Sequence, residues 1–445
     1  MVPLNHSWVV STIFLIPYHV VNNEDFLHFI WKYRLYYTPG LTCTSGDALE
    51  IIHPGFHNLD AGPDFCDAKI RIGTILWSGN VEIHCRSSDW NRHQHQVDQA
   101  YDNVILHVVS HHDQKILRTD GTEISVLEIG HLIPKDISKN YSELMHSLKW
   151  IPCEDKISHL DSVYIHSSLS GILIERLESK SEQIYRVLSE VRGSWDDAFY
   201  ILLARNFGFK TNALPFEMLA RSLPKSLIAR YKSTTFQIES LIFGQAGFLE
   251  GKFKDEYPNL LKQEYNYLQK KHGLKPIDKY LWKYMRLRPG NFPTIRLAQF
   301  AALLSSSNHL FARIIEETEP DKVARMFKNL KLNDYWNRHY RFDKEGNYSL
   351  TAIGEEAINN ILINTVAYFL FAYGLRTGSE WHRDRAIFML EGLKSEQNSI
   401  IRRFSKIGIK SDSSALSQAL IELKKSYCDQ KKCLSCMIGI KFLRK

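Results

Sequence analysis

The sequence has few cysteines and few long apolar segments, and both features narrow the class of protein. Seven cysteines in 445 residues, unevenly spaced, are too few for a secreted disulfide framework. After residue 22, no segment approaches the ~18 apolar residues of a membrane-spanning helix. There is no repeat of fixed period and no low-complexity tract, which argues against a repeat architecture. We therefore expect a soluble, cytoplasmic, globular protein that does not associate with membranes.

Neither sign of charge dominates the composition. Lys and Arg number 56 against 49 Asp and Glu, which gives a net charge of +7. This excess permits a nucleic-acid partner without requiring one. A chain of 445 residues that is 44% hydrophobic is long enough for two or three domains with their own cores.

The N-terminus is apolar from Trp8 to Val21, but it does not have the pattern of a signal peptide. No Lys or Arg precedes the apolar stretch, and no clear small-residue cleavage site follows it. We interpret residues 1–22 as a loosely attached extension, or as the result of an upstream start codon.

The chain after residue 22 predicts an α+β fold in which an N-terminal mixed sheet precedes a larger all-α domain. Asn23 is placed to cap a helix that begins at Glu24. Four strands are expected next, with a short helix before the last one, at 48–53, 68–72, 75–85 and 103–110. A hairpin is expected around Asp120-Gly121. This α/β domain should span residues 23–150.

Helical periodicity dominates from residue 151 to 427, and we expect an all-helical domain there. The segment Ile358–Tyr373 is apolar nearly all round, which predicts a buried central helix. Residues 428–445 form a separate C-terminal segment that carries a cysteine cluster.

Acidic and imidazole side chains gather on or beside three of the predicted strands. Glu82 and His84 are two residues apart in a strand and therefore project from the same face. Asp64 stands at the head of the preceding strand, and Glu50 lies in the strand before that. Carboxylates are the ligands that Mg²⁺ and Mn²⁺ prefer. We therefore predict a magnesium or manganese site of Asp64, Glu82 and Glu50, with His84 as a base or an orienting group beside the attacking water.

Two alternatives stay open for this site. His93, His95 and Asp98 follow closely in the sequence and could extend a metal or phosphate site beside Glu82. Exposed histidines also commonly contact only solvent, and Asp64 and Glu82 could serve a purely structural role at strand ends.

The pattern Pro63-Asp64…Glu82-x-His84 in the order αβββαβ resembles the PD-(D/E)XK nuclease superfamily. That resemblance implies a restriction-endonuclease-like fold and cleavage of DNA or RNA, with Asp64 and Glu82 as the motif acids and Glu50 as the upstream acid of some members. His84 stands where the superfamily has Lys. The chain also resembles an uncharacterised bacterial family classed as a domain of unknown function, through the phrases GPDF, GNVEIH, SSDW, YDNVILHVV, FGFKTNALPFE, FGQAGFL, RLRPGNFPTIRLAQ and YC…CLSC.

Cys428, Cys433 and Cys436 form a C-x4-C-x2-C cluster near the C-terminus. Three thiols within nine residues of a cytoplasmic protein indicate a zinc or iron–sulfur site. Both kinds of site need a fourth ligand, and Cys153 is the best candidate. A zinc ion and a [4Fe–4S] cluster cannot be separated by this spacing.

Arginines near aromatic residues could grip a phosphate backbone with stacked bases. The candidates are Arg286, Arg288 and Arg296 around the PGNFPT segment, with Arg383 and Arg385 as a similar pair. Two functions follow from the whole sequence. The first is a metal-dependent nuclease, and the second is a non-catalytic nucleic-acid-binding or assembly protein that keeps a nuclease-like fold.

Overall fold

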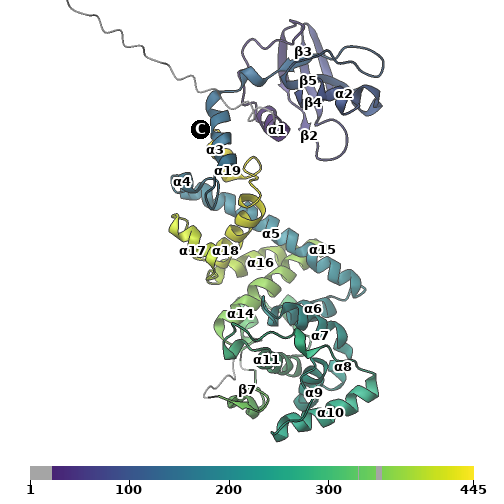
Figure 1. The fold of residues 1–445 in the computed structure, drawn as a ribbon, viewed down its shortest axis with the longest axis vertical. Helices are drawn as coiled ribbons and strands as arrows, with labels where there is room; N and C mark the ends of the chain where they lie inside the picture. The colour runs from purple at the N-terminus through teal and green to yellow at the C-terminus, as the bar shows by residue number, and fades with distance from the viewer. Residues whose placement is uncertain (1–22, 329, 347–352, 445) are drawn as a thin grey trace, which may run out of the picture. The chain divides into compact units, whose positions relative to one another are not determined.

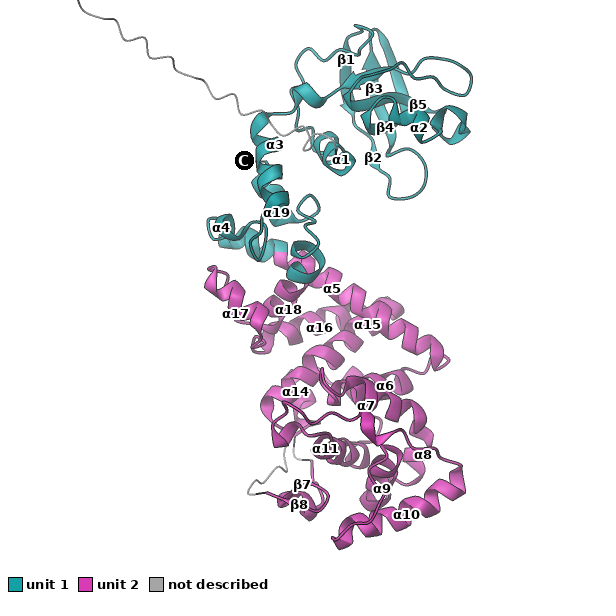
Figure 2. Ribbon diagram, viewed as in Figure 1, with its two compact units in different colours: residues 1–168, 423–445 teal, residues 169–422 magenta. Residues whose placement is uncertain are grey.

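The structure is a computed structural model in which residues 23–328, 330–346 and 353–444 are described. The predicted extension, residues 1–22, lies outside them. The chain forms two compact units (Figure 2). Unit 1 comprises the residues up to 168 together with those from 423 onwards, and unit 2 comprises residues 169–422. A mixed sheet followed by a mostly helical region makes the fold α+β, as predicted.

The mixed sheet belongs to unit 1 and has the strand order β1-β3-β4-β5-β6, with β2 paired to β3. β1, β3 and β4 are antiparallel neighbours, whereas β4, β5 and β6 run parallel. The bounds of the strands are β1 Leu49–His53, β2 Phe56–His57, β3 Phe65–Ile72, β4 Ile75–Arg86, β5 Val104–His111 and β6 Val126–Glu128.

β5 lies inside the sheet, and its sequence explains why. The strand VILHVVSH is buried at every position except the last, as expected for a β-branched run covered on both faces. β4 has an irregularity in its pairing with β5 between Asn80 and Val81. Gly79 is required there, because a Cβ atom would lie 2.6 Å from the carbonyl oxygen of Asn103.

Three short segments connect β4 to β5 where one helix was predicted. They are α2 Asp89–Arg92 and the 3-10 turns His95–Val97 and Gln99–Tyr101. Trp90 of α2 is fully buried in a core cluster with Val104 and Val109 of β5. The predicted hairpin around Asp120-Gly121 is confirmed only in part. An antiparallel bridge joins Leu117 to Glu123, and the Ile124 N–H donates to the Ile116 carbonyl oxygen at 3.2 Å, but the residues that follow join the sheet as β6.

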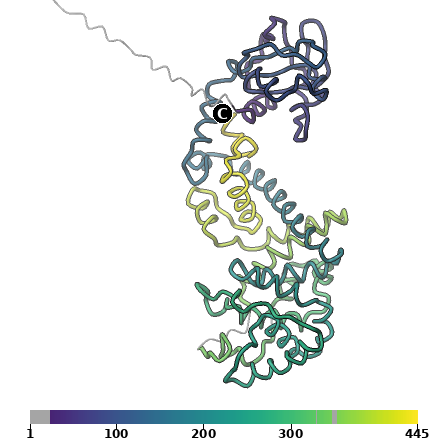
Figure 3. The backbone as a smooth tube through the Cα atoms, turned by 45° about the vertical axis from the view of Figure 1, so that its right-hand side comes forward, coloured from purple at the N-terminus to yellow at the C-terminus, as the bar shows by residue number. Residues whose placement is uncertain are grey.

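Helix α1, Glu24–Lys32, packs on β4 and begins where predicted, because the Asn23 side chain accepts a hydrogen bond from the Phe26 N–H. The other helices described in unit 1 are the 3-10 turn Gly130–Leu132, α3 Lys135–His146, α4 Glu154–Ile157, a π-helix Leu423–Cys428 and α19 Met437–Leu443. The C-terminal helix α19 lies beside α3 (Figures 1 and 3), although the two are about 300 residues apart in sequence. The Lys431 Nζ also donates to the Met145 carbonyl oxygen at 2.6 Å.

The described residues of unit 2 form helices and one small hairpin. The helices are α5 Ser162–Glu190, which begins in unit 1, α6 Trp195–Phe207, α7 Ala213–Ser222, α8 Lys225–Arg230, α9 Thr235–Gln245, α10 Glu256–His272, α11 Pro293–Ser306, α12 Leu310–Glu316, α13 Pro320–Arg325, α14 Glu355–Ile361, α15 Tyr368–Thr377, α16 Glu380–Gly392, α17 Ser399–Lys406 and α18 Ser414–Glu422. Strands β7 His339–Arg341 and β8 Lys344–Glu345 pair with each other.

One helix among the described residues is long and apolar enough to cross a membrane, by length and composition alone. It runs over Glu355–Thr377, through α14, a π-helical stretch Leu362–Ala367 and α15. Of its most apolar window, 72% is buried inside the structure. The segment Ile358–Tyr373 is therefore a buried helix of the core, as its all-round apolar sequence predicted.

Glu239 of α9 is a buried acid, and its ionisation should make the free energy of unfolding depend on pH. Burial raises its pKa from 4.5 to about 7, and Tyr257 offsets this only in part. In the unfolded chain the group loses its proton at lower pH. The free energy of unfolding should therefore fall as the pH rises from about 4.5 to about 7, and stay low above that range.

The Glu239→Gln variant should lose this pH dependence, because its side chain cannot ionise. At pH 8 it should be more stable than the wild type by up to about 3 kcal/mol, and near pH 4.5 the two should be alike. Chemical unfolding at several pH values measures this. The exposed Glu250→Gln change serves as the control. A Glu239→Gln variant that kept the wild-type pH dependence would show that another group causes it.

Candidate functional site

Asp64 and Glu82 are held side by side by the backbone of two neighbouring strands. The Asp64 N–H donates to Glu82 Oε2 at 3.1 Å, and Asp64 Oδ2 accepts from the Ile83 N–H at 2.9 Å. Each carboxylate therefore accepts a hydrogen bond from a backbone N–H at or next to the other acid. Burial raises the pKa of Glu82, and the Asp64 charge raises it further. A cation placed between the two acids would offset their repulsion.

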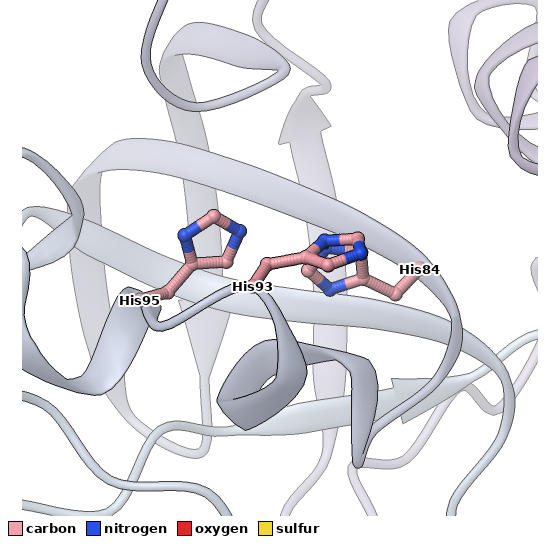
Figure 4. Close-up of side chains that lie close together, drawn as sticks. All are labelled: His84, His93 and His95. Atoms are coloured by element: carbon pink, nitrogen blue, oxygen red, sulfur yellow. The ribbon is translucent and has the colours of Figure 1, made fainter.

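Three imidazoles stand beside Glu82. The Nε2 atoms of His84 and His95 lie 3.5 and 3.4 Å from Glu82 Oε1, and His93 Nδ1 lies 3.1 Å from His84 Nε2. One ring nitrogen from each of the three histidines lies within 4.8 Å of the others (Figure 4). Among the described residues, this is the group of three with the spacing of metal ligands.

The histidines differ in burial and in the role their environment allows. His84 and His95 are buried, whereas His93 is exposed. Burial, aided by His93 and His95, lowers the pKa of His84 to about 3, so this imidazole is neutral near pH 7. Its Nδ1 atom lies 2.8 Å from Nε2 of the fully buried His107. That contact fixes the ring of His84 with Nε2 toward the group, as an outer-shell partner does for a ligating histidine.

The segment after β4 is shaped so that His93 and His95 both reach the group. Gln94, between them, has a φ of +65°, a left-handed conformation that is uncommon outside glycine. The Tyr101 ring stacks on His95 with 3.7 Å between ring centroids. At the start of the segment, Ser87 Oγ donates to Asp113 Oδ1 at 2.9 Å. A strained backbone residue next to a polar cluster is typical of a functional site and is less expected in a loop that only connects two strands.

His28 of α1 completes the group, and the sequence reasoning did not include it. Its Nε2 atom lies 3.1 Å from Asp64 Oδ2. Burial lowers the pKa of His28, but Asp64 and other nearby acids outweigh this, and the net pKa is raised. Its position on the helix face toward the sheet was the signal that could have identified it. Only the packing of α1 on β4 shows which strand residue it meets.

The structure does not bring Glu50 or Asp98 to this group. Glu50 is exposed and forms an ion pair with Arg71. Arg71 pairs across the sheet with Leu76, which is six residues before Glu82 on β4, or about 20 Å along the strand. Asp98 instead accepts a hydrogen bond from the Ala100 N–H at the start of a 3-10 turn. The acids of the group are therefore Asp64 and Glu82, and its remaining donors are imidazoles.

The four cysteines singled out in the sequence come together within unit 1. Burial raises the pKa of Cys153 to about 12, and the nearby Cys436 and Cys433 thiols add to this rise. The pKa of Cys433 is likewise about 12, from burial and Cys436, and burial with Cys153 raises that of Cys428. The structure thus gathers the four thiols in one part of unit 1.

The arginines proposed for nucleic-acid contact are not alike. Arg286 and Arg288 are exposed, whereas Arg296 is buried in α11. Arg385 of α16 donates to the carbonyl oxygens of Ile314 and Ile315 at 2.5 and 2.6 Å, as a side chain that closes the end of α12. The structure therefore favours a structural role for Arg385.

Comparison with known proteins gives one match. The model of a family described as "Protein of unknown function (DUF2851)" matches residues 24–399. Neither the curated proteins nor the solved structures that were compared match the chain. The resemblance to a domain-of-unknown-function family is confirmed, and the nuclease resemblance stays a prediction.

A metal-binding test follows from the donor set. Imidazole nitrogens bind Zn²⁺ and Mn²⁺ better than Mg²⁺, so Zn²⁺ and Mn²⁺ should raise the melting temperature of the chain more than Mg²⁺. His93→Ala, at an exposed position, should weaken the metal affinity roughly 10- to 100-fold without unfolding the sheet. Thermal shift and calorimetric titration measure this. The exposed His111→Ala change is the matched control, and equal loss in both variants would place the metal elsewhere.

Proposed function

The chain belongs to the DUF2851 family, and we propose that it is a metal-dependent hydrolase that cleaves phosphodiester bonds in DNA or RNA. The observation that carries the proposal is the pairing of Asp64 and Glu82 beside three imidazoles that have metal-ligand spacing.

The arrangement of the sheet supports the nuclease assignment. Apart from the two-residue strand β2, the chain runs through one helix, the antiparallel strands β1, β3 and β4, a helical connection and a strand parallel to β4, in the order αβββαβ. In the PD-(D/E)XK motif the first acid precedes one strand of the meander and the second acid lies within the next strand. Asp64 and Glu82 occupy these places on β3 and β4.

The residues present fit a divalent cation, although not the all-carboxylate site expected from the sequence. Glu82 Oε1 lies within about 3.5 Å of Nε2 of both His84 and His95, and the exposed His93 completes the group. Carboxylates with imidazoles suit Mn²⁺ or Zn²⁺ better than Mg²⁺. A cation bound there would polarise a phosphoryl oxygen and lower the pKa of an attacking water.

The protein's own side chains then have separate roles. Asp64 and Glu82 supply negative charge at fixed positions, because the backbone N–H groups of Ile83 and Asp64 hold their oxygens. His107 orients His84 from the buried side. His28 holds the Asp64 carboxylate in place, because its Nε2 atom contacts Asp64 Oδ2. His93, as the exposed imidazole, stands on the side from which a substrate can enter.

The decisive experiment is a cleavage assay on labelled single- and double-stranded DNA and RNA with Mn²⁺, Zn²⁺ or Mg²⁺. Asp64→Asn and Glu82→Gln each remove one charged ligand while keeping the side-chain shape. Each should lower the rate at least roughly 100-fold, because the charge that holds the cation is lost. Cleavage that persisted in both variants after stringent purification would refute the proposal.

Glu50→Gln distinguishes the site seen in the structure from the one predicted from sequence alone. Glu50 lies with Arg71, away from the group, so this variant should cleave at the wild-type rate. A loss in Glu50→Gln equal to that in Asp64→Asn would mean that the working site includes the β1 acid after all.

A second function, nucleic-acid binding without turnover, is favoured by one observation. His84 occupies the place of the motif Lys, and its low pKa leaves it uncharged near pH 7. It therefore cannot supply the fixed positive charge of an ammonium group. In that case gel-shift assays should show salt-sensitive binding with no cleavage under any metal, and Asp64→Asn should bind as the wild type does.

For the cysteine group we infer a [4Fe–4S] cluster held by Cys153, Cys428, Cys433 and Cys436. One distant cysteine with a C-terminal trio resembles the iron–sulfur site of some nucleases of the PD-(D/E)XK superfamily, and this likeness favours the cluster over zinc. Gly439 supports this packing, because a Cβ atom there would lie 2.4 Å from the Cys433 carbonyl oxygen.

Anaerobic purification with a visible spectrum and metal analysis tests the cluster. The wild type should show a broad band near 400 nm with about four iron atoms per chain. Cys153→Ser should lose both, and Cys66→Ser on β3, outside the group, should keep both. One zinc and no iron would refute the cluster and assign zinc to the four thiols.

A further inference from the structure

A cavity in unit 2 is lined by an arginine whose charge no described carboxylate neutralises. The cavity has a volume of about 720 Å³, within the range of small-molecule pockets. Its wall comes from the 3-10 turn Pro289–Asn291, from α11, from the first turn of α14 and from Phe209. Its lining includes Arg296, which is only 6% exposed.

Uncharged groups orient the Arg296 guanidinium. Its terminal nitrogens donate to Gln299 Oε1 at 3.0 Å and to Asn291 Oδ1 at 2.6 Å. Its Nε atom is buried and has no hydrogen-bond partner among the described residues. Burial lowers the pKa of Arg296 to about 10, with no opposing influence of an acid. The side chain is thus a cation at neutral pH that is held in place but not charge-compensated, a costly arrangement for the protein alone.

The surroundings of Arg296 favour an anion. Arg288, which is exposed, lines the same cavity, and the lining includes Gly354 and Ala357 at the start of the 23-residue helix Glu355–Thr377. The N-terminus of such a helix carries partial positive charge. Glu356 also lines the cavity, as an exposed side chain, and it contributes nothing to the pKa of Arg296.

Phe209 adds strain to the same wall. Its ring lies 4.5 Å from the Arg296 guanidinium carbon, and its φ of +47° is left-handed, which is an outlier for a bulky residue. Such strain persists only where the surrounding structure imposes it, and it gathers at ligand sites. Here it places an aromatic face against one side of the guanidinium.

We propose that this cavity binds the phosphate group of a phosphorylated ligand, with Arg296 as its central contact and Arg288 at its mouth. A guanidinium fork matches phosphate oxygens, and the charge of the ligand supplies the missing counter-charge. Since a cavity of about 720 Å³ exceeds one phosphate, there is room for an attached group the size of a nucleoside. The phosphate could belong to a free nucleotide or to the end of a nucleic-acid strand. This site is separate from the proposed hydrolase site and stands without it.

The test is calorimetric titration of the full chain, with EDTA present to prevent cleavage. The probes are inorganic phosphate, adenosine monophosphate and one oligonucleotide with either a 5′-phosphate or a 5′-hydroxyl. Inorganic phosphate and at least one larger phosphorylated probe should bind. Arg288→Gln, an exposed change, should weaken binding roughly tenfold, Arg296→Gln should weaken it more, and the exposed Arg230→Gln on α8 should bind as the wild type.

The arms of the test identify the ligand. Tighter binding of the 5′-phosphorylated oligonucleotide than of adenosine monophosphate assigns a strand end, and the reverse assigns a free nucleotide. Equal binding of the two oligonucleotides, together with no binding of adenosine monophosphate, would overturn the proposal, because the terminal phosphate would then be irrelevant. Absence of binding for every phosphorylated probe at millimolar concentration, or wild-type affinity in both Arg288→Gln and Arg296→Gln, would overturn it as well.

Discussion

Two carboxylates held side by side by the backbone form the constraint on which the candidate site depends. The pairing of Phe65 with Val81 sets the register of β3 against β4, and this register brings the N–H of Asp64 to Glu82 and the N–H of Ile83 to Asp64. A slip of one residue would turn Glu82 to the opposite face of the sheet. The chemistry of the site is therefore a consequence of strand pairing, and the imidazoles are added to it from α1 and from the segment after β4.

Three of the polar groups that the structure describes are proposed as binding sites. The Asp64–Glu82 pair concentrates negative charge, four thiols are packed together near Cys433, and Arg296 carries a positive charge without a described acid beside it. Proteins rarely tolerate such groups, because an unpaired buried charge costs far more than a surface one. A cation complements the acid pair, a metal cluster complements the thiols, and an anion complements Arg296.

The sequence predicted the order of the first elements well, because each carries a local signal. Asn23 caps α1 through its own side chain, and the β-branched run of β5 is buried as such runs are. The hairpin around Asp120-Gly121 forms only in part, for a non-local reason. A turn signal shows that the chain reverses there, but not whether the next residues pair with their neighbours or with β5.

The sequence by itself determined the α+β class, the buried helix over Ile358–Tyr373 and the residue types of the site, since spacing and periodicity are local properties. Only the tertiary structure decided which of those residues meet. It excluded Glu50, which lies opposite Arg71, and it added His28 through the packing of α1 on β4. It also brought Cys153 to the C-terminal thiols. Contacts between residues far apart in the chain depend on strand register and helix packing, which no local pattern encodes.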